Sequence, residues 1–155
     1  MCKEDKFRSL FLQIGFSQKL QLKGAYDLFF GSLTIDDIER LLSQNTFFSY
    51  AYSPSSIIEL ANVKSCDKMN LIIFEGNYLT RFLPEEITAI LLHEIGHAFN
   101  SSLKGLDGEF VADKFVKEKG YGRWIISALE KGVKQNLNGF DSDICNKRII
   151  KLKEV

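Results

Sequence analysis

The chain has 155 residues, of which 45% are hydrophobic and 13 are phenylalanine. That size and content suffice for one domain with its own core and exclude a disordered chain. Lys plus Arg equal Asp plus Glu at 20 each, giving a formal net charge of zero, so no electrostatic attraction to nucleic acid is expected.

Targeting signals and cysteines bear on the compartment. No apolar run reaches the ~20 residues needed to cross a bilayer, so no membrane span is expected. The N-terminal sequence MCKEDKFRSLF is charged and lacks the apolar region of a secretory signal. The odd number of cysteines, Cys2, Cys66 and Cys145, predicts reduced thiols in a cytoplasmic protein.

The first part of the chain contains two predicted helices and an ambiguous stretch. Apolar residues at helical spacing over 7–14 predict a short opening helix. Residues 16–33 (FSQKLQLKGAYDLFFGSL) have no decisive period, and two strands joined at Gly24 are one interpretation. The sequence Thr34-Ile35-Asp36-Asp37 is typical of a capped helix start, and the apolar face that follows extends to about Ser43.

Two runs rich in β-forming residues come next. Residues 48–52 alternate aromatic and small side chains, which predicts a strand ending at Ser53-Pro54. A short helix is expected at 55–63. Residues 71–74 (LIIF) predict a second strand, which ends at Glu75-Gly76-Asn77.

The run LPEEITAILLHEIGHAFN over residues 83–100 predicts a central helix. Pro84 suits the first helical position, and Glu85 and Glu86 follow where the helix dipole favours acids. The apolar residues form a broad face that predicts burial: Ile87, Ile90, Leu91, Ile95, Ala98 and Phe99.

Both histidines of the chain, His93 and His97, lie on this helix in an H-E-x-x-H pattern. Residues four apart share a helical face, so two imidazole nitrogens can meet at one point, as Zn²⁺ requires. Glu94 lies about 100° further round, within reach of a water held there, where it would act as a general base. Gly96 has no side chain and would let another backbone pack closely. A chance match is the alternative, but unpaired histidines in a buried helix are costly.

A catalytic zinc site has three protein ligands and one open position, so a third ligand is needed. The extended metzincin pattern is excluded, because Leu103 stands where that pattern requires a histidine. The nearest downstream acids are Asp107, Glu109 and Asp113.

The stretch DGEFVADKFVKEKGYG (107–122) predicts a second helix, with Asp107 near its N-cap and Gly120 just past its end. Glu109 and Asp113 are four residues apart and share a face. One of them would therefore ligate the metal while the other orients a ligating histidine. A solvated acidic face is the alternative, which the apolar neighbours of Asp113 make less favourable.

The motif HEIGH followed by ExxAD resembles the gluzincin zinc metallopeptidases of the CAAX-prenyl-endopeptidase and heat-shock-peptidase type, and their small relatives, the minigluzincins. The resemblance implies that one Zn²⁺ per chain is bound by His93, His97 and Glu109. It implies that Glu94 is the general base and that Asp113 lies one shell outside the metal.

The resemblance extends over residues 69–153. It implies that the strand at 71–74 is an edge strand above the active-site helix, where an extended peptide substrate would pair with it. An ordinary buried strand is the alternative. Some relatives have a further histidine near the C-terminus, which this chain lacks. The group that stabilises the transition state is therefore unassigned, with Arg148, Arg123 and Tyr121 as candidates.

Helical patterns after Gly120, a loop at 136–143 and a last helix from Ile144 complete the chain. We therefore expect one zincin-like domain over 1–155, of α+β class, mainly helical, with a small sheet.

The expected function is that of a soluble zinc metallopeptidase that cleaves protein or peptide substrates, as an endopeptidase by the resemblance. The zinc-activated water would attack the scissile carbonyl while Glu94 takes its proton and passes it to the leaving amine. One alternative is a catalytically silent zinc-binding domain that recognises peptides. Another is a deformylase-like hydrolase, for which Cys66 lacks the required sequence context.

Overall fold

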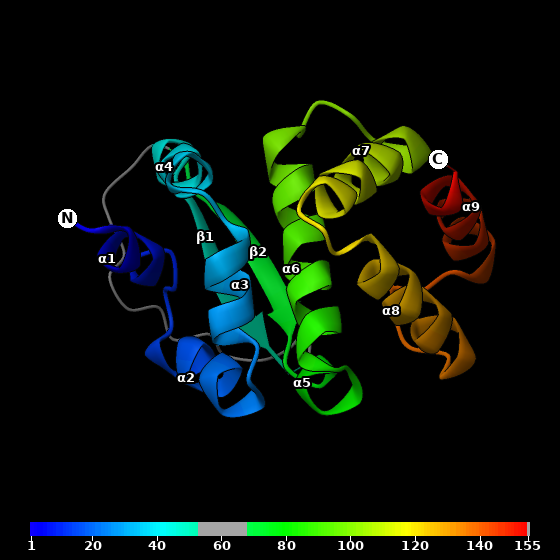
Figure 1. The fold of residues 1–155 in the computed structure, drawn as a ribbon, viewed down its shortest axis with the longest axis horizontal. Helices are drawn as coiled ribbons and strands as arrows, with labels where there is room; N and C mark the ends of the chain where they lie inside the picture. The colour runs from blue at the N-terminus through cyan, green and yellow to red at the C-terminus, as the bar shows by residue number, and fades with distance from the viewer. Residues whose placement is uncertain (53–67, 155) are drawn as a thin grey trace. The chain divides into compact units, whose positions relative to one another are not determined.

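The structure, a computed structural model, describes residues 1–52 and 68–154 (Figure 1). Over these residues the chain is mainly helical with one two-stranded parallel sheet, which confirms the expected α+β class. It divides into two compact units, Met1–Pro84 and Glu85–Val155. The assignment of one domain to the whole chain stays a prediction.

The described part of the first unit contains five helices and two strands. They are α1 (Lys3–Arg8), α2 (Ile14–Lys23), α3 (Tyr26–Ser32), α4 (Ile35–Ser43), β1 (Thr46–Ala51), β2 (Asn70–Glu75) and α5 (Tyr78–Arg81). The opening helix lies earlier than the expected span of 7–14, at Lys3–Arg8, and residues 10–12 lie along β1 instead. There the Leu12 N–H donates to Phe48 O over 3.1 Å, and the Phe48 N–H donates to Leu10 O over 2.7 Å.

The interpretation of residues 16–33 as two strands is wrong, since they form α2 and α3. Gly24 separates these helices with a φ of 80°, and the Ala25 N–H donates to Leu20 O over 2.9 Å. A left-handed glycine suits both a helix C-cap and a hairpin turn. The glycine alone therefore could not distinguish the two structures.

Helix α4 begins and ends where the sequence predicts. The Thr34 hydroxyl accepts from the Asp37 N–H over 3.1 Å, and the Asp37 carboxylate accepts from the Thr34 N–H over 2.8 Å. This capping box satisfies donors that the first turn would otherwise leave unpaired.

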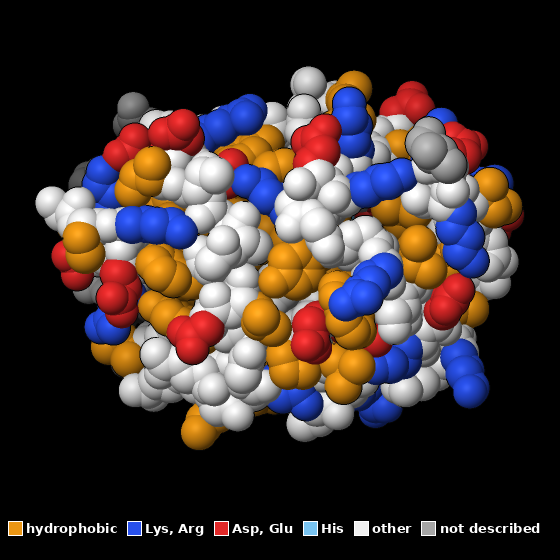
Figure 2. Space-filling model, in the orientation of Figure 1, with side chains coloured by type: hydrophobic (Ala, Val, Ile, Leu, Met, Phe, Trp, Pro, Cys, Tyr) orange, Lys and Arg blue, Asp and Glu red, His pale blue; other side chains and the backbone are white. Residues whose placement is uncertain are grey.

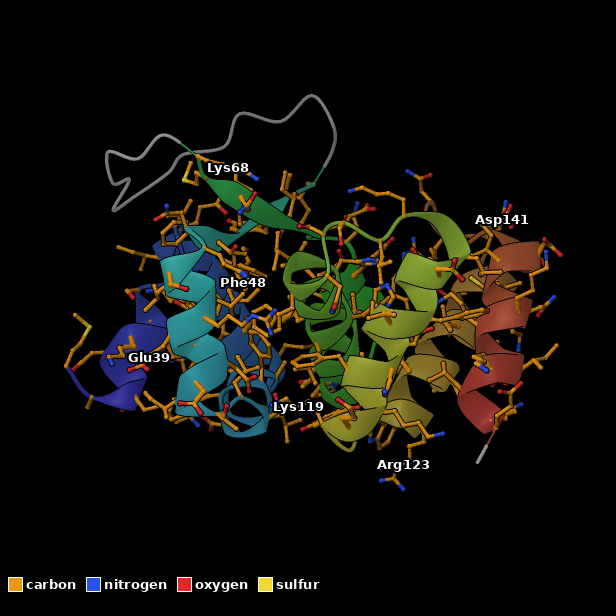
Figure 3. All side chains as sticks on the ribbon, turned by 90° about the horizontal axis from the view of Figure 1, so that it is seen from above. Glu39, Phe48, Lys68, Lys119, Arg123 and Asp141 are labelled. Atoms are coloured by element: carbon orange, nitrogen blue, oxygen red, sulfur yellow. The ribbon has the colours of Figure 1, made fainter. Side chains whose placement is uncertain are left out.

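Both predicted strands are confirmed, and they pair in parallel from Thr46↔Asn70 to Ala51↔Glu75. The core of this unit is built from phenylalanine rings, and Phe48 on β1 is fully buried (Figure 3). Its ring centroid lies 5.4 Å from that of Phe11 and 5.3 Å from that of Phe29. Many of the chain's phenylalanines are thus used in one aromatic core.

Side chains on β2 alternate between Ile72 and Phe74, which are buried, and Leu71 and Ile73, which are exposed. One face of β2 is therefore buried and the other face is exposed. Its expected place above the helix at 83–100 stays a prediction, since the strand and that helix belong to different units. The helix expected at 55–63 lies outside the described residues.

The second unit contains α6 (Pro84–Phe99), α7 (Gly105–Glu118), α8 (Gly122–Lys134) and α9 (Ser142–Lys153). Helices α7, α8 and α9 lie side by side (Figure 1). Pro84 is the first residue of α6, as predicted. Helix α7 begins earlier than expected, so Asp107 lies in its first turn and Lys104 is the N-cap.

The ends of the remaining helices follow local signals. Gly120, just past α7, has a φ of 84°, which agrees with the predicted glycine stop. Helix α9 begins two residues before Ile144, because the Asp141 side chain caps it by accepting from the Ile144 N–H over 3.0 Å.

Basic and acidic side chains are interspersed on the face displayed in Figure 2, in keeping with the zero net charge. Among the described helices, none is long and apolar enough to span a bilayer.

Candidate metal centre

The site begins with two histidines one turn apart on α6. The His93 and His97 Nε2 atoms lie 3.0 Å apart. His93 is buried, whereas the His97 side chain is 31% exposed. The two imidazoles therefore converge on one point that solvent can reach from the His97 side.

Glu109 on α7 brings a carboxylate to the same point. Its Oε2 lies 3.3 Å from His93 Nε2, and its Oε1 lies 3.3 Å from His97 Nε2. The three donors lie within 4.8 Å of one another and form a group that could hold a metal ion. Of the acids considered, Asp107 is exposed and is not part of this group.

The spacing of these donors can be compared with that of a zinc site. Ligand atoms about 2.0–2.1 Å from a tetrahedral ion are roughly 3.3 Å apart. The observed separations of 3.0, 3.3 and 3.3 Å are close to that value. Two imidazoles and one carboxylate are also a donor set of catalytic zinc sites that keep a position open. The residues therefore fit Zn²⁺ in both chemistry and spacing.

Asp113, one turn after Glu109, lies behind His93. Its Oδ1 is 2.8 Å from His93 Nδ1, and the residue is 3% exposed. When Nδ1–H donates to this carboxylate, the lone pair of the neutral ring is on Nε2, which faces Glu109 and His97. The structure thus places Asp113 where it can orient a ligating histidine.

Arg148 on α9 completes the polar cluster. Its Nε and Nη2 donate to Asp113 Oδ2 and Oδ1 over 2.8 and 2.7 Å, and its Nη1 lies 3.0 Å from Glu109 Oε2. The Nη2 atom is also 3.1 Å from His93 Nδ1. The residue is 7% exposed. Arg148 therefore contacts one candidate ligand carboxylate, that of Glu109, and the aspartate that lies against another candidate ligand, His93.

The sequence singled out Arg148 only as a candidate for stabilising the transition state. A better signal was present, because Arg148 stands at helical spacing among residues that are all buried: Cys145, Ile149 and Leu152. An arginine on the apolar face of a helix predicts a buried carboxylate partner.

The other two candidates lie near the start of α8. Arg123 is exposed and points away from the helix (Figure 3), with its guanidinium 4.7 Å from the centre of the Trp124 ring. Tyr121 is the partly buried N-cap residue of α8, and burial raises the pKa of its hydroxyl.

Charges in the cluster shift several pKa values. Burial would raise the pKa of Glu109, but hydrogen bonds from His93 and His97 outweigh it and hold that pKa well below its usual range. Burial likewise opposes ionisation of Asp113, whose pKa is lowered by Arg148 and His93. Burial would lower the pKa of His93, yet its bonds to Asp113 and Glu109 raise it. Both carboxylates are therefore ionised at neutral pH.

Glu94 follows His93 on α6 and is partly exposed. Within the part of the chain that the structure describes, its carboxylate makes no hydrogen bond or ion pair. A carboxylate without such a partner, on the residue that follows a candidate ligand, is available to accept a proton.

Comparisons of the chain with known protein families, curated proteins and solved structures found no match. The geometry of the second unit is therefore the main basis for assigning a function.

Proposed function

We propose that this protein is a zinc-dependent metallopeptidase. The convergence of His93, His97 and Glu109 on one point carries the proposal, because their Nε2 and carboxylate atoms are spaced 3.0–3.3 Å apart. The motif combination HExxH and ExxAD supports the same assignment through its resemblance to gluzincin peptidases.

A zinc ion held there would lower the pKa of a water molecule and polarise a substrate carbonyl. The two imidazoles must remain neutral to act as ligands. By accepting the Nδ1–H bond, Asp113 fixes the orientation of the His93 ring and, in the neutral ring, selects the tautomer whose lone pair is on Nε2.

Glu94 would hold the proton during peptide hydrolysis. Its carboxylate takes the proton of the attacking water and then donates it to the nitrogen of the leaving amine. The absence of a hydrogen-bond partner for Glu94 among the described residues supports this role. A buried, paired carboxylate would be less available for the same task.

The alternatives receive less support. A deformylase-like site requires a cysteine ligand, and the candidate metal group of the described residues contains none; Cys66 lies outside those residues. A silent peptide-recognition domain has no use for an unpartnered Glu94.

We also propose a reducing, cytoplasmic location, because Cys2 and Cys145 are free thiols.

The experiment that tests the proposal combines metal content with hydrolysis. Purified protein should contain about one zinc per chain by elemental analysis, consistent with a single three-ligand site. It should cleave an unfolded, casein-like protein, lose this activity with a chelator and regain it with added zinc. Zinc-loaded protein that cleaves none of several unfolded substrates would favour the silent binding domain. Protein that binds no zinc would overturn the proposal.

A further inference from the structure

Arg148 holds a buried positive charge next to the candidate metal centre. Two of its nitrogens donate to the two oxygens of Asp113 over 2.8 and 2.7 Å, and a third lies 3.0 Å from Glu109 Oε2. The planar guanidinium therefore joins two carboxylates that stand four residues apart on α7. No other cation of the described residues has an ion pair with either carboxylate in the structure, histidines aside.

Two physical effects of this arginine on zinc binding have opposite signs. Its positive charge repels a dication, so removing the charge alone would strengthen zinc binding. Its hydrogen bonds fix two carboxylates in place, so removing them would leave Glu109 and Asp113 to repel each other and lose their orientation. The geometry favours the second effect, because among the described residues the hydrogen bonds and ion pairs of the guanidinium are with Asp113, Glu109 and His93.

We propose that Arg148 is a positioning residue that strengthens zinc binding despite its own charge. The inference rests on the proposed metal centre. Through its two-pronged bond Arg148 holds Asp113 against His93 Nδ1, and through Nη1 it holds the Glu109 carboxylate toward the histidines. Helix α9 thereby becomes part of the metal site, although it contributes no ligand.

The test measures zinc affinity by competition with a chelator in the full-length protein. Arg148→Met removes the charge and keeps a long apolar stem, and Arg148→Lys keeps the charge but cannot donate two parallel bonds to a carboxylate. Both variants should bind zinc more weakly, the methionine variant by roughly 10–100-fold, as for other residues that orient metal ligands. Unchanged or tighter binding in Arg148→Met would overturn the inference and leave only charge repulsion.

Two variants on the same helix serve as controls. Lys147→Met removes an exposed cation whose partner is Asp143, at 2.7 Å, and should leave zinc affinity unchanged. Ile149→Ala removes buried packing from α9 and should lower the thermal midpoint while changing zinc affinity much less than Arg148→Met. If Ile149→Ala weakens zinc binding as strongly, Arg148 acts only by keeping the helix folded, and the inference fails.

A double-mutant cycle gives a readout that general destabilisation would not produce. If Arg148 acts through Asp113, then Arg148→Lys should weaken zinc binding much less in an Asp113→Asn background than in wild type. Additive effects would contradict the inference. The cycle uses Arg148→Lys, so it can be measured even if Arg148→Met does not fold. Wild-type protein that binds no zinc would instead overturn the proposed function itself.

Discussion

Gly96 on α6 lies against Ala112 on α7 so closely that a Cβ atom at position 96 would be 2.7 Å from the Ala112 Cα and 3.0 Å from its carbonyl oxygen. Gly96 is adjacent in sequence to the candidate ligand His97, and Ala112 to Asp113. The expectation that a missing side chain here lets another backbone approach is therefore confirmed, and the backbone that approaches is the one that bears Glu109.

Gly96→Ala should therefore destabilise the protein. The new methyl group meets backbone atoms, which cannot rotate away, and overpacking of this kind typically costs about 1–3 kcal/mol. Denaturant unfolding of the zinc-free protein should show this loss, and the displaced α7 should also weaken zinc binding. Gly31→Ala is the matched control, since a Cβ at that helical glycine meets nothing within 4 Å. It should be neutral or slightly stabilising, and equal effects of the two changes would contradict the packing argument.

Glu109→Ala should remove most of the bound zinc. Only the two histidines would remain as ligands, so affinity should fall by more than the roughly 100-fold that is typical of losing an outer hydrogen-bond partner. Elemental analysis after dialysis measures the effect. Asp107→Ala, an exposed acid in the first turn of the same helix, should retain the metal. Full retention by the Glu109 variant would exclude Glu109 as the third ligand.

Asp113→Ala should weaken zinc binding by roughly 10–100-fold without abolishing it at saturating zinc. It should also destabilise the zinc-free protein by about 3–5 kcal/mol, because it leaves the buried guanidinium of Arg148 without its main partner. Chelator competition and denaturant unfolding report the two effects separately. A zinc affinity equal to that of wild type would show that Asp113 does not orient His93 in the metal-bound state.

Several of these features could be predicted from local sequence, and others could not. The cap of α4 and the proline start of α6 depend on neighbouring residues, so their positions were predictable. Gly24 shows the limit of such signals, because its left-handed backbone serves a helix end as well as a hairpin. Arg148 shows a different limit. Its contacts with Asp113 join residues 35 positions apart, and only the packing of α9 on α7 brings them together.

The pH dependence of zinc binding should follow from the raised pKa of His93, whose hydrogen bonds to Asp113 and Glu109 favour the protonated ring. Zinc requires the neutral ring, so affinity should increase as pH rises through that pKa, with release of protons. The folding stability of the zinc-free protein should instead decrease over the same pH range. The stability contributed by protonated His93 is complete below the unfolded pKa of about 6.5 and is lost as pH rises through the higher folded value.

The carboxylates of the site affect folding stability at lower pH. Glu109 and Asp113 have lowered pKa values, so their contribution is present above the unfolded values of about 4 and is lost as pH falls through the folded ones. Chelator competition for zinc and urea unfolding of zinc-free protein, each over a pH series, measure these dependences. A zinc affinity that is constant from slightly acidic to slightly basic pH would contradict the role of His93.

Glu94→Gln separates an enzyme from a binding domain. Glu94 is outside the group of candidate ligands, and among the described residues it makes no hydrogen bond or ion pair. The variant should therefore retain zinc content and thermal midpoint near those of wild type. Glutamine cannot accept the proton of the attacking water, so turnover should fall by about 10²–10⁴-fold. Cleavage of an unfolded protein by equally zinc-loaded wild type and variant, followed by gel and mass spectrometry, measures this loss. Equal cleavage by both would indicate a contaminating protease or another base, and a variant that also loses zinc would place Glu94 among the ligands.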